Sequence, residues 1–166
     1  LANETELNLR IVGLQSQINP HFLFNSLNAI SATAVEEHSE KVPTMCYQLG
    51  ELFRYSSGGN SLVTLSDEVN YMKTYLQFMK YRYEDNFSFE IEQKGECNTI
   101  EIARMALQPL VENCFTHAFK TVIPPYRMKV ICIVNEDGWK FEVADNGAGF
   151  SEEQIRFISE EIFKID

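Results

Sequence analysis

Three polar side chains at helical spacing lie within the apolar segment LQSQINPHFLFN, residues 14–25. Gln17, His21 and Asn25 are four residues apart, so on a helix they share one face. A neutral imidazole is a nucleophile near physiological pH, and an exposed one on a helical bundle could attack a phosphorus centre. A lone histidine in a helix more often has a structural role, but polar neighbours one turn away on both sides favour chemistry at His21.

The segment LQPLVENCFTHAF holds a second pair of candidates, Asn113 and His117, which also share a helical face. An amide oxygen can ligate a hard cation such as Mg²⁺, which bridges phosphates. His117, one turn on, could donate to a phosphate oxygen. Taken alone this is a weak signal, because an asparagine and a histidine on a solvated face are ordinary.

The segment DNGAGF follows an expected strand and supplies a third candidate. Gly147 and Gly149 would let the backbone approach a flat ligand closely, and the Asp145 carboxylate can accept a hydrogen bond from an exocyclic amine. Asp-Asn-Gly is also common turn chemistry, so a plain turn is the better interpretation of this motif alone.

Composition restricts the possible classes of protein. The 166 residues fit one domain, or one small domain with a helical appendage. The net charge of −10 argues against nucleic acid or an anionic membrane surface as the main partner. No apolar stretch approaches ~20 residues, so we expect no membrane span, and no signal peptide is visible. The four cysteines are widely spaced, three of them in apolar patterns typical of buried thiols, so neither disulfides nor a zinc site is expected.

Two helices are expected before a linker. The first covers about residues 4–34, and Pro20 either kinks it, which we favour, or begins a new helix capped by Asn19. The second covers about residues 42–55 and forms an antiparallel hairpin with the first. A hairpin alone has too small a core, so a four-helix dimer is expected. The sequence SSGGNS, residues 56–61, is the expected linker and domain boundary.

Helices and strands alternate after the linker, which predicts an α+β fold. Ser66 is a plausible N-cap for a helix to residue 83, and the Asn-Glu-Asp-Gly sequence at 135–138 is an expected hairpin turn. The other expected elements are strands at 87–91, 127–134 and 139–144 and helices at 105–120 and 151–165. The chain opens in mid-pattern, so we expect it to be a piece of a longer protein.

In this order, the three segments closely resemble those of the sensor histidine kinases of the LytS and YesM type. LQSQINPHFLFNSLNAI resembles the phosphoacceptor box of that family, and LQPLVENCFTHAF is similar to its N box. VADNGAGF resembles the first glycine box shared by the gyrase, MutL and histidine kinase ATPases. The intervening segment YLQFMKYRYEDNFSFEIE also fits the family pattern, so the resemblance runs from about residue 8 to residue 155.

This resemblance implies an α+β protein in two parts. Residues 1–60 would form a helical hairpin for dimerisation that carries the histidine phosphoacceptor. Residues 61–166 would form the ATP-binding catalytic domain, an α/β sandwich of the histidine kinase and gyrase type. Family members continue into an ATP lid and a second glycine box, whereas this chain ends at Asp166. We therefore expect a truncated domain that binds nucleotide weakly or not at all.

The resemblance also implies roles in the nucleotide site. Asn113 would ligate Mg²⁺ and His117 would face the phosphates. Asp145 would bind the adenine amine, and Gly147 and Gly149 would shape the pocket. ATP and Mg²⁺ are therefore the expected cofactors.

In the acceptor box, the resemblance implies that His21 takes the γ-phosphoryl group of ATP and later passes it to an aspartate on a response regulator. Asn25 would lie beside the phosphohistidine, and we hypothesise that it positions a water or shapes the regulator's approach during dephosphorylation. Larger kinase families place an acid directly after the acceptor, where this chain and its subfamily have Phe22. Gln17 could fix the imidazole tautomer but is no base, so no general base for His21 is evident.

A contrast with ATPases favours a kinase. Hydrolases of the superfamily carry a glutamate one turn before the N-box asparagine, where this chain has Pro109. Phosphoryl transfer depends mainly on positioning and charge neutralisation, so loss of a water-activating base suits transfer to a histidine. The favoured hypothesis is an ATP-dependent protein-histidine kinase. The alternatives are a nucleotide-independent dimerisation or phosphotransfer module that retains the fold, and a chaperone or topoisomerase piece, in which NPHFLFN has no use.

By the same resemblance, the partners would be a response regulator that binds DNA and a second copy of the chain, with no direct contact to nucleic acid. The chain would be the cytoplasmic portion of a bacterial two-component sensor, anchored in the membrane through segments upstream of it.

Overall fold

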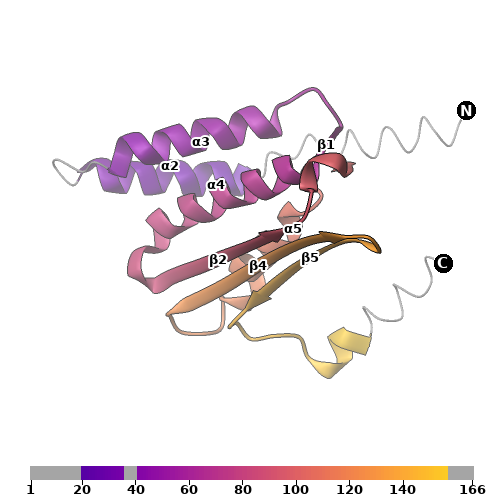
Figure 1. Ribbon diagram of the computed structural model, residues 1–166. Coiled ribbons are helices and arrows are strands. Elements are labelled where there is room, and N and C mark those ends of the chain that lie inside the picture. Colours follow the sequence, from indigo (N-terminus) through magenta and orange to yellow (C-terminus); the bar gives the residue numbers. More distant parts are fainter. Residues whose placement is uncertain (1–19, 36–40, 157–166) are drawn as a thin grey trace, which may run out of the picture.

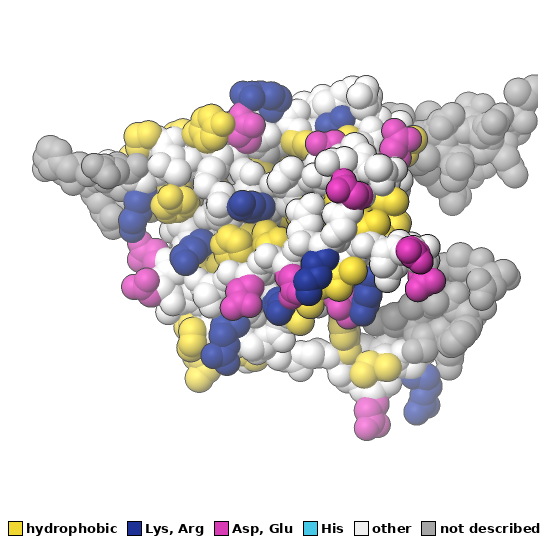
Figure 2. All heavy atoms as spheres, in the orientation of Figure 1, with side chains coloured by type: hydrophobic (Ala, Val, Ile, Leu, Met, Phe, Trp, Pro, Cys, Tyr) yellow, Lys and Arg dark blue, Asp and Glu magenta, His cyan; other side chains and the backbone are white. Residues whose placement is uncertain are grey.

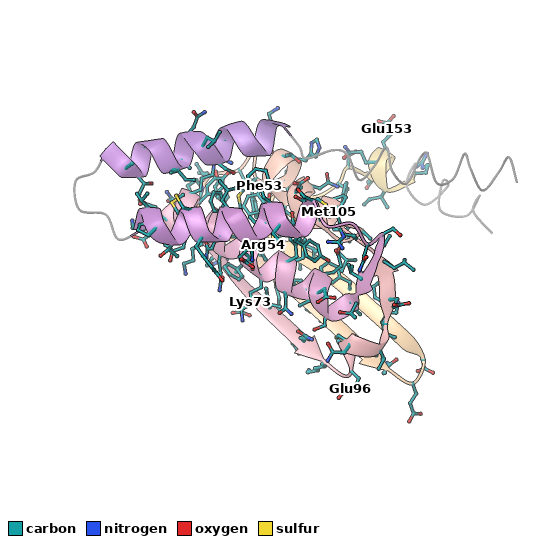
Figure 3. The ribbon with its side chains drawn as sticks, turned by 90° about the horizontal axis from the view of Figure 1, so that it is seen from above. Phe53, Arg54, Lys73, Glu96, Met105 and Glu153 are labelled. Atoms are coloured by element: carbon teal, nitrogen blue, oxygen red, sulfur yellow. The ribbon has the colours of Figure 1, made fainter. Side chains whose placement is uncertain are left out.

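The computed structural model describes residues 20–35 and 41–156 of the chain. Helices are layered over one face of a three-stranded sheet (Figure 1). α2 (Pro20–Val35) and α3 (Lys41–Ser56) run in opposite directions and, seen from above, lie side by side (Figure 3). α4 (Leu65–Tyr83) lies between α3 and the sheet. Whether a helix continues through Pro20 from the preceding residues lies outside the described residues.

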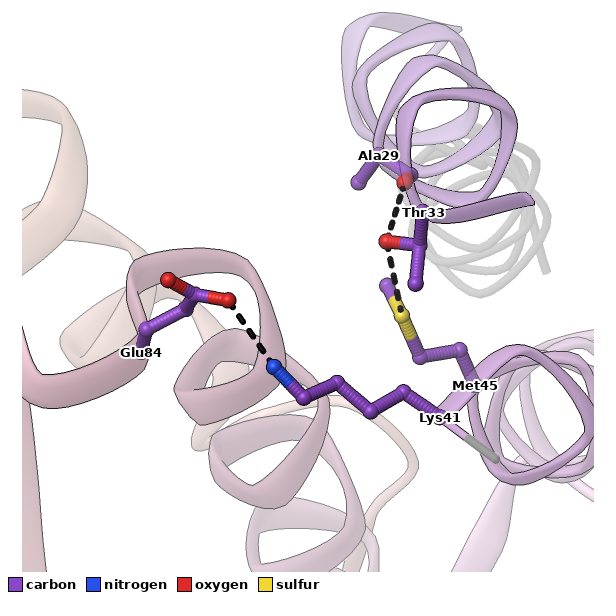
Figure 4. Close-up of polar contacts among 5 residues, drawn as sticks. All are labelled: Ala29, Thr33, Lys41, Met45 and Glu84. Atoms are coloured by element: carbon purple, nitrogen blue, oxygen red, sulfur yellow. Dashed lines mark hydrogen bonds and ion pairs between the residues drawn. The ribbon is translucent and has the colours of Figure 1, made fainter. Parts of the chain in front are cut away.

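Side-chain contacts connect these three helices at the end where α2 passes into α3 (Figure 4). The Thr33 hydroxyl bonds the Ala29 carbonyl of its own helix at 2.9 Å and lies 3.8 Å from the Met45 sulfur of α3. Lys41 Nζ pairs with Glu84 Oε1, just beyond α4, at 3.0 Å. Both charged side chains of that pair are exposed, so it contributes little stability. Buried apolar side chains therefore dominate the packing of α3 on α4.

A mixed three-stranded sheet lies beneath α4. β2 (Phe87–Lys94) pairs in parallel with β4 (Tyr126–Asn135), which pairs antiparallel with β5 (Gly138–Asp145). Asn135 lies opposite Gly138, which confirms the predicted hairpin turn. All three strands are slightly longer than predicted, because backbone pairing continues past the side chains whose alternation marks them.

A second sheet, of two short strands, was not predicted. β1 (Leu62–Thr64) pairs antiparallel with β3 (Glu101–Ala103). Strands of three residues each are too short to show an alternation of apolar and polar residues in the sequence. They tie the connection between α3 and α4 to the segment that leads toward residue 108.

The described part of the chain has two buried apolar clusters, and the larger one extends from the sheet through α4 to α3. Met45, Leu49 and Leu52 of α3 belong to the same buried cluster as the α4 and sheet side chains. Fully or almost fully buried members of this cluster are Met45, Met72, Leu76, Phe78, Phe87, Val111 and Val130. Cys97, Cys114 and Cys132 are buried, as predicted, and Cys46 is exposed; all four are free thiols.

Charged side chains on one face of the molecule are not separated by sign. On the face shown in Figure 2, basic and acidic side chains are interspersed despite the net charge of −10. Glu92 pairs with Lys94 at 2.5 Å and with Lys129 at 3.2 Å. Within the described ranges, no helix is long and apolar enough to cross a membrane.

The start of α4 corrects the predicted cap. The helix begins at Leu65, and Thr64, not Ser66, is its N-cap. Thr64 Oγ1 accepts from the Asp67 backbone N–H at 3.1 Å, and Asp67 Oδ2 accepts from the Thr64 N–H at 3.1 Å. This reciprocal capping box satisfies two donors that the first turn leaves without partners, and it begins where β1 ends.

Replacing Thr64 with alanine should lower the free energy of unfolding by about 1 kcal/mol, because it removes the acceptor for the Asp67 N–H. Ser66→Ala is the matched control and should change it by no more than about 0.5 kcal/mol. Urea unfolding of both variants checks the assignment. An equal loss of stability in Ser66→Ala would contradict the assignment of Thr64 as the N-cap and favour Ser66.

Candidate functional site

The segment that contains Asn113 and His117 is not the single helix predicted over residues 105–120. α5 is short, Gln108–Asn113, with Pro109 in its first turn as expected. A π-helical turn (η3, Cys114–Ala118) follows it and is closed by a bond from the Phe119 N–H to the Cys114 carbonyl at 2.8 Å. π-Turns are rare and are frequently found at functional sites.

The predicted helix starts too early because Met105 has a φ of +61°, a left-handed conformation that no helix accepts. Of the two candidates from this segment, Asn113 directly precedes the π-turn and His117 lies within it. Both side chains are exposed. They are therefore available to a ligand, although the wider turn changes the angle between them from that of a regular α-helix.

The loop after β5 lies directly against this π-turn. The Ala148 N–H donates to the Ala118 carbonyl at 2.9 Å. A Cβ added at Gly147 would lie 2.5 Å from both the carbonyl oxygen and the Cβ of Ala118, so only glycine permits this approach. Gly149 has a φ of +68°, which also favours glycine. The structure thus brings together two of the three segments singled out in the sequence.

Asp145 is held by donors on both carboxylate oxygens. Oδ1 accepts from the Gly147 N–H at 2.7 Å, and Oδ2 accepts from the Cys114 thiol at 3.3 Å. Burial, followed by the hydrogen bond to Asp145, raises the pKa of the Cys114 thiol to about 12. Asp145 itself is exposed, so its remaining lone pairs face outward. A fixed, accessible carboxylate beside a close-packed glycine loop can accept hydrogen bonds from a flat ligand.

The plain-turn interpretation of Asp-Asn-Gly is also correct, and it does not conflict with a site. Asn146 Oδ1 accepts from the Arg127 N–H at 2.7 Å, and its Nδ2 donates to the Pro125 carbonyl at 2.9 Å. Asn146 therefore fastens the loop to the start of β4, while its neighbour Asp145 is left at the surface.

The acceptor segment is only partly described. His21 lies in the first turn of α2, but its side chain lies outside what the structure describes, and so does Gln17. Asn25, one turn further along α2, is half-buried and lines a cavity of about 560 Å³ that it shares with side chains of α4 and the π-turn. Polar lining residues of this cavity include Arg82, Glu112, Thr116 and Lys120. α2 thus approaches the segment of Asn113 on the side that Glu112 and Thr116 occupy.

Across the described ranges, no cluster of three or more His, Cys, Asp or Glu side chains could hold a metal ion. A cation at Asn113 would therefore need further oxygen ligands from phosphates or water. Mg²⁺ suits such a site, since it usually keeps several waters and binds through few protein groups.

Glu68, which belongs to none of the three motifs, fixes the position of the segment that leads into α5. Its side chain is 0% exposed. Its carboxylate accepts from the backbone N–H of Met105 at 2.7 Å and of Leu107 at 3.3 Å, and from the Tyr55 hydroxyl at 2.5 Å. The spacing of Leu65, Glu68 and Met72 places this glutamate on the buried face of α4, which is the signal that could have revealed it.

A second chain of hydrogen bonds continues from α4 into α5. The Tyr71 hydroxyl donates to Gln108 Oε1 at 3.0 Å, and Gln108 Nε2 donates to Glu112 Oε1 at 2.6 Å. Burial raises the pKa of Tyr71 above its usual range, so this donor stays protonated. The side chains next to Asn113 therefore depend on α4 for their positions.

Glu68→Gln should lower the free energy of unfolding by about 1–3 kcal/mol, because an amide offers one acceptor where the buried site needs two. Glu142→Gln, on the exposed face of β5, should change it by less than about 0.5 kcal/mol. Urea unfolding of the two variants measures the difference. Equal effects would show that the buried hydrogen bonds of Glu68 contribute nothing.

Gly147→Ala should destabilise the protein by about 1–3 kcal/mol, because the new Cβ overlaps the Ala118 carbonyl. Gly59→Ala is the matched control, since nothing lies within 4 Å of its added Cβ. Thermal unfolding compares the two variants. A Gly147→Ala protein as stable as the Gly59→Ala protein would contradict the close approach.

Comparison with known proteins adds an independent observation. Residues 9–87 match the family model described as Histidine kinase. The chain is 34% identical to Sensor protein LytS of Staphylococcus haemolyticus (strain JCSC1435) over 152 residues, which is 90% of this chain and 26% of that protein. It is 37% identical to Sensor protein LytS of Bacillus subtilis (strain 168) over 142 residues, which is 84% of this chain and 24% of that protein. The chain thus spans about a quarter of the length of these relatives.

Proposed function

Because the chain belongs to the LytS-type sensor histidine kinases, we propose that it carries the phosphoacceptor and ATP-binding parts of such a kinase. His21 accepts the γ-phosphoryl group of ATP and later passes it to an aspartate of a response regulator. Residues 1–60 form the dimerisation and acceptor hairpin, and residues 61–166 form the ATP-binding domain, an α/β sandwich.

The observation that carries this proposal is the contact between the π-turn and the aspartate loop. The bonds from Cys114 to Asp145 and from Ala148 to Ala118 join the two segments in which all the nucleotide-site candidates lie. A structural turn alone would not need an exposed carboxylate held by two donors, on a loop that contacts the segment with the exposed Asn113 and His117 side chains.

Each side chain has a role that suits its chemistry. Asp145 accepts a hydrogen bond from the adenine amine, and the backbone at Gly147 and Gly149 borders the base. The Asn113 amide oxygen is a ligand for Mg²⁺, which neutralises phosphate charge when bound, and His117 donates to a phosphate oxygen. Positioning and charge neutralisation are the main requirements of phosphoryl transfer, and these groups supply both.

Transfer is favoured over hydrolysis by the residues near Asn113. Pro109, one turn earlier, has no side chain that could activate water. Glu112 accepts a hydrogen bond from Gln108 and lines the cavity next to α2. A glutamate engaged on that side is poorly placed to activate water for attack on a phosphate at Asn113.

Asn25 and its surroundings connect the acceptor helix to this site. Its place in the cavity, with Thr116 and Lys120, supports an approach of α2 to the nucleotide-binding segment. We assign Asn25 to dephosphorylation, in which its amide positions a water or the incoming regulator beside the phosphohistidine.

The remaining properties follow from the family. The kinase acts as a homodimer, transfers its phosphoryl group to a response regulator and makes no direct contact with nucleic acid. Its acceptor and ATP-binding parts lie in the cytoplasm, and the full-length sensor is held in the membrane.

Incubation of the full-length sensor that contains this chain with γ-labelled ATP and Mg²⁺ should place acid-labile label on the protein, because a phosphoramidate of histidine hydrolyses in acid. His21→Ala should reduce the label to background, since the attacking nitrogen is gone. His38→Ala is the matched control and should keep wild-type labelling.

Label that persists in the His21→Ala protein would refute the acceptor assignment. A wild-type protein that neither binds nor uses ATP would instead favour a nucleotide-independent phosphotransfer module.

A further inference from the structure

Cys114 connects the π-turn to the aspartate loop through its side chain. The side chain is 5% exposed, and its sulfur lies 3.3 Å from Asp145 Oδ2 and 3.5 Å from the Leu110 carbonyl oxygen. A thiol donates one proton at a time. The carboxylate is both nearer and charged, so it is the stronger acceptor.

The thiol is the donor in this pair, because an ordinary cysteine thiol is protonated at physiological pH and an ionised carboxylate has no proton to donate. With the Gly147 N–H on Oδ1 and the thiol on Oδ2, rotation of the Asp145 carboxyl group would break at least one hydrogen bond. The outward lone pairs of Asp145 therefore have a fixed direction before any ligand arrives, which lowers the cost of binding.

We propose that Cys114 is a positioning residue of the nucleotide site, whose thiol orients the Asp145 carboxylate to select a purine with an amine at C6. This inference rests on the proposed function. An amine donates to the carboxylate, whereas the carbonyl oxygen that guanine has at the same position is repelled by it. Fixing the direction of the acceptor is what makes this difference in affinity large.

The test measures ATP and GTP binding by isothermal titration of the full-length sensor that contains this chain, as wild type and as three cysteine variants. Cys114→Val keeps an apolar side chain of similar size and removes the donor, and it should weaken ATP binding by about 10-fold while leaving GTP binding unchanged. Cys114→Ser restores a donor and should keep ATP affinity within about twofold of wild type. Cys132→Val, buried beside Cys97 and away from the loop, should leave both affinities unchanged.

Thermal unfolding without nucleotide shows whether each variant is folded, and Cys114→Ala replaces Cys114→Val if the latter is not. Equal ATP affinity in the wild-type and Cys114→Val proteins would overturn the role of Cys114 and leave the proposed function standing. Equal losses in the serine and valine variants would mean that packing, not the donor, matters, and would also overturn it. A wild-type protein that binds neither nucleotide would overturn the proposed function itself.

The S–H stretching band of Cys114 reports the hydrogen bond of the thiol directly, apart from any effect of packing on affinity. The S–H stretching band that disappears in Cys114→Val should shift in Asp145→Asn, because a neutral amide is a weaker acceptor than a carboxylate. An unchanged band would show that the thiol does not donate to Asp145.

Discussion

A carboxylate without access to solvent is the constraint on which the rest of the structure depends. Glu68 is completely buried, and a buried charge without partners would cost several kcal/mol or more. Its three donors come from two different parts of the chain, the end of α3 and the loop before α5. The chain can satisfy this charge only when α3, α4 and the entry to α5 are assembled together, so the position of Asn113 is set by helix packing far from any ligand.

The same reasoning explains why the π-turn and the aspartate loop meet where they do. α5 starts from a fixed point at Leu107, and the loop follows β5, whose register on β4 is fixed by a two-residue turn. The two segments meet at a carbonyl, an N–H and a glycine with no room for a side chain. The helices and the sheet thereby position the candidate site residues, which lie on the connecting segments, as in many binding sites.

Much of the fold was predictable from sequence, and the failures have physical causes. Alternating apolar residues predicted β2, β4 and β5, and the Asn-Glu-Asp-Gly turn predicted their hairpin. Ser66 was preferred as a cap because it stands before two acids, whereas the reciprocal bond of Thr64 with Asp67 decides the matter. Neither the π-turn nor the positive φ of Met105 corresponds to a local sequence pattern, so neither could be predicted. The motifs named Asn113, His117 and Asp145, but the thiol that holds Asp145 could be found only in three dimensions.

Arg104 contacts both ends of the connection between α3 and β1. Its Nη1 bonds the Tyr55 carbonyl at 2.5 Å, its Nε bonds the Asn60 carbonyl at 2.7 Å, and its guanidinium lies 5.0 Å from the centre of the Tyr55 ring. Both ends of this glycine-containing connection are thus hydrogen-bonded to the Arg104 side chain. A displacement of the last turn of α3 would therefore also move Arg104, which itself lies only a few residues before α5.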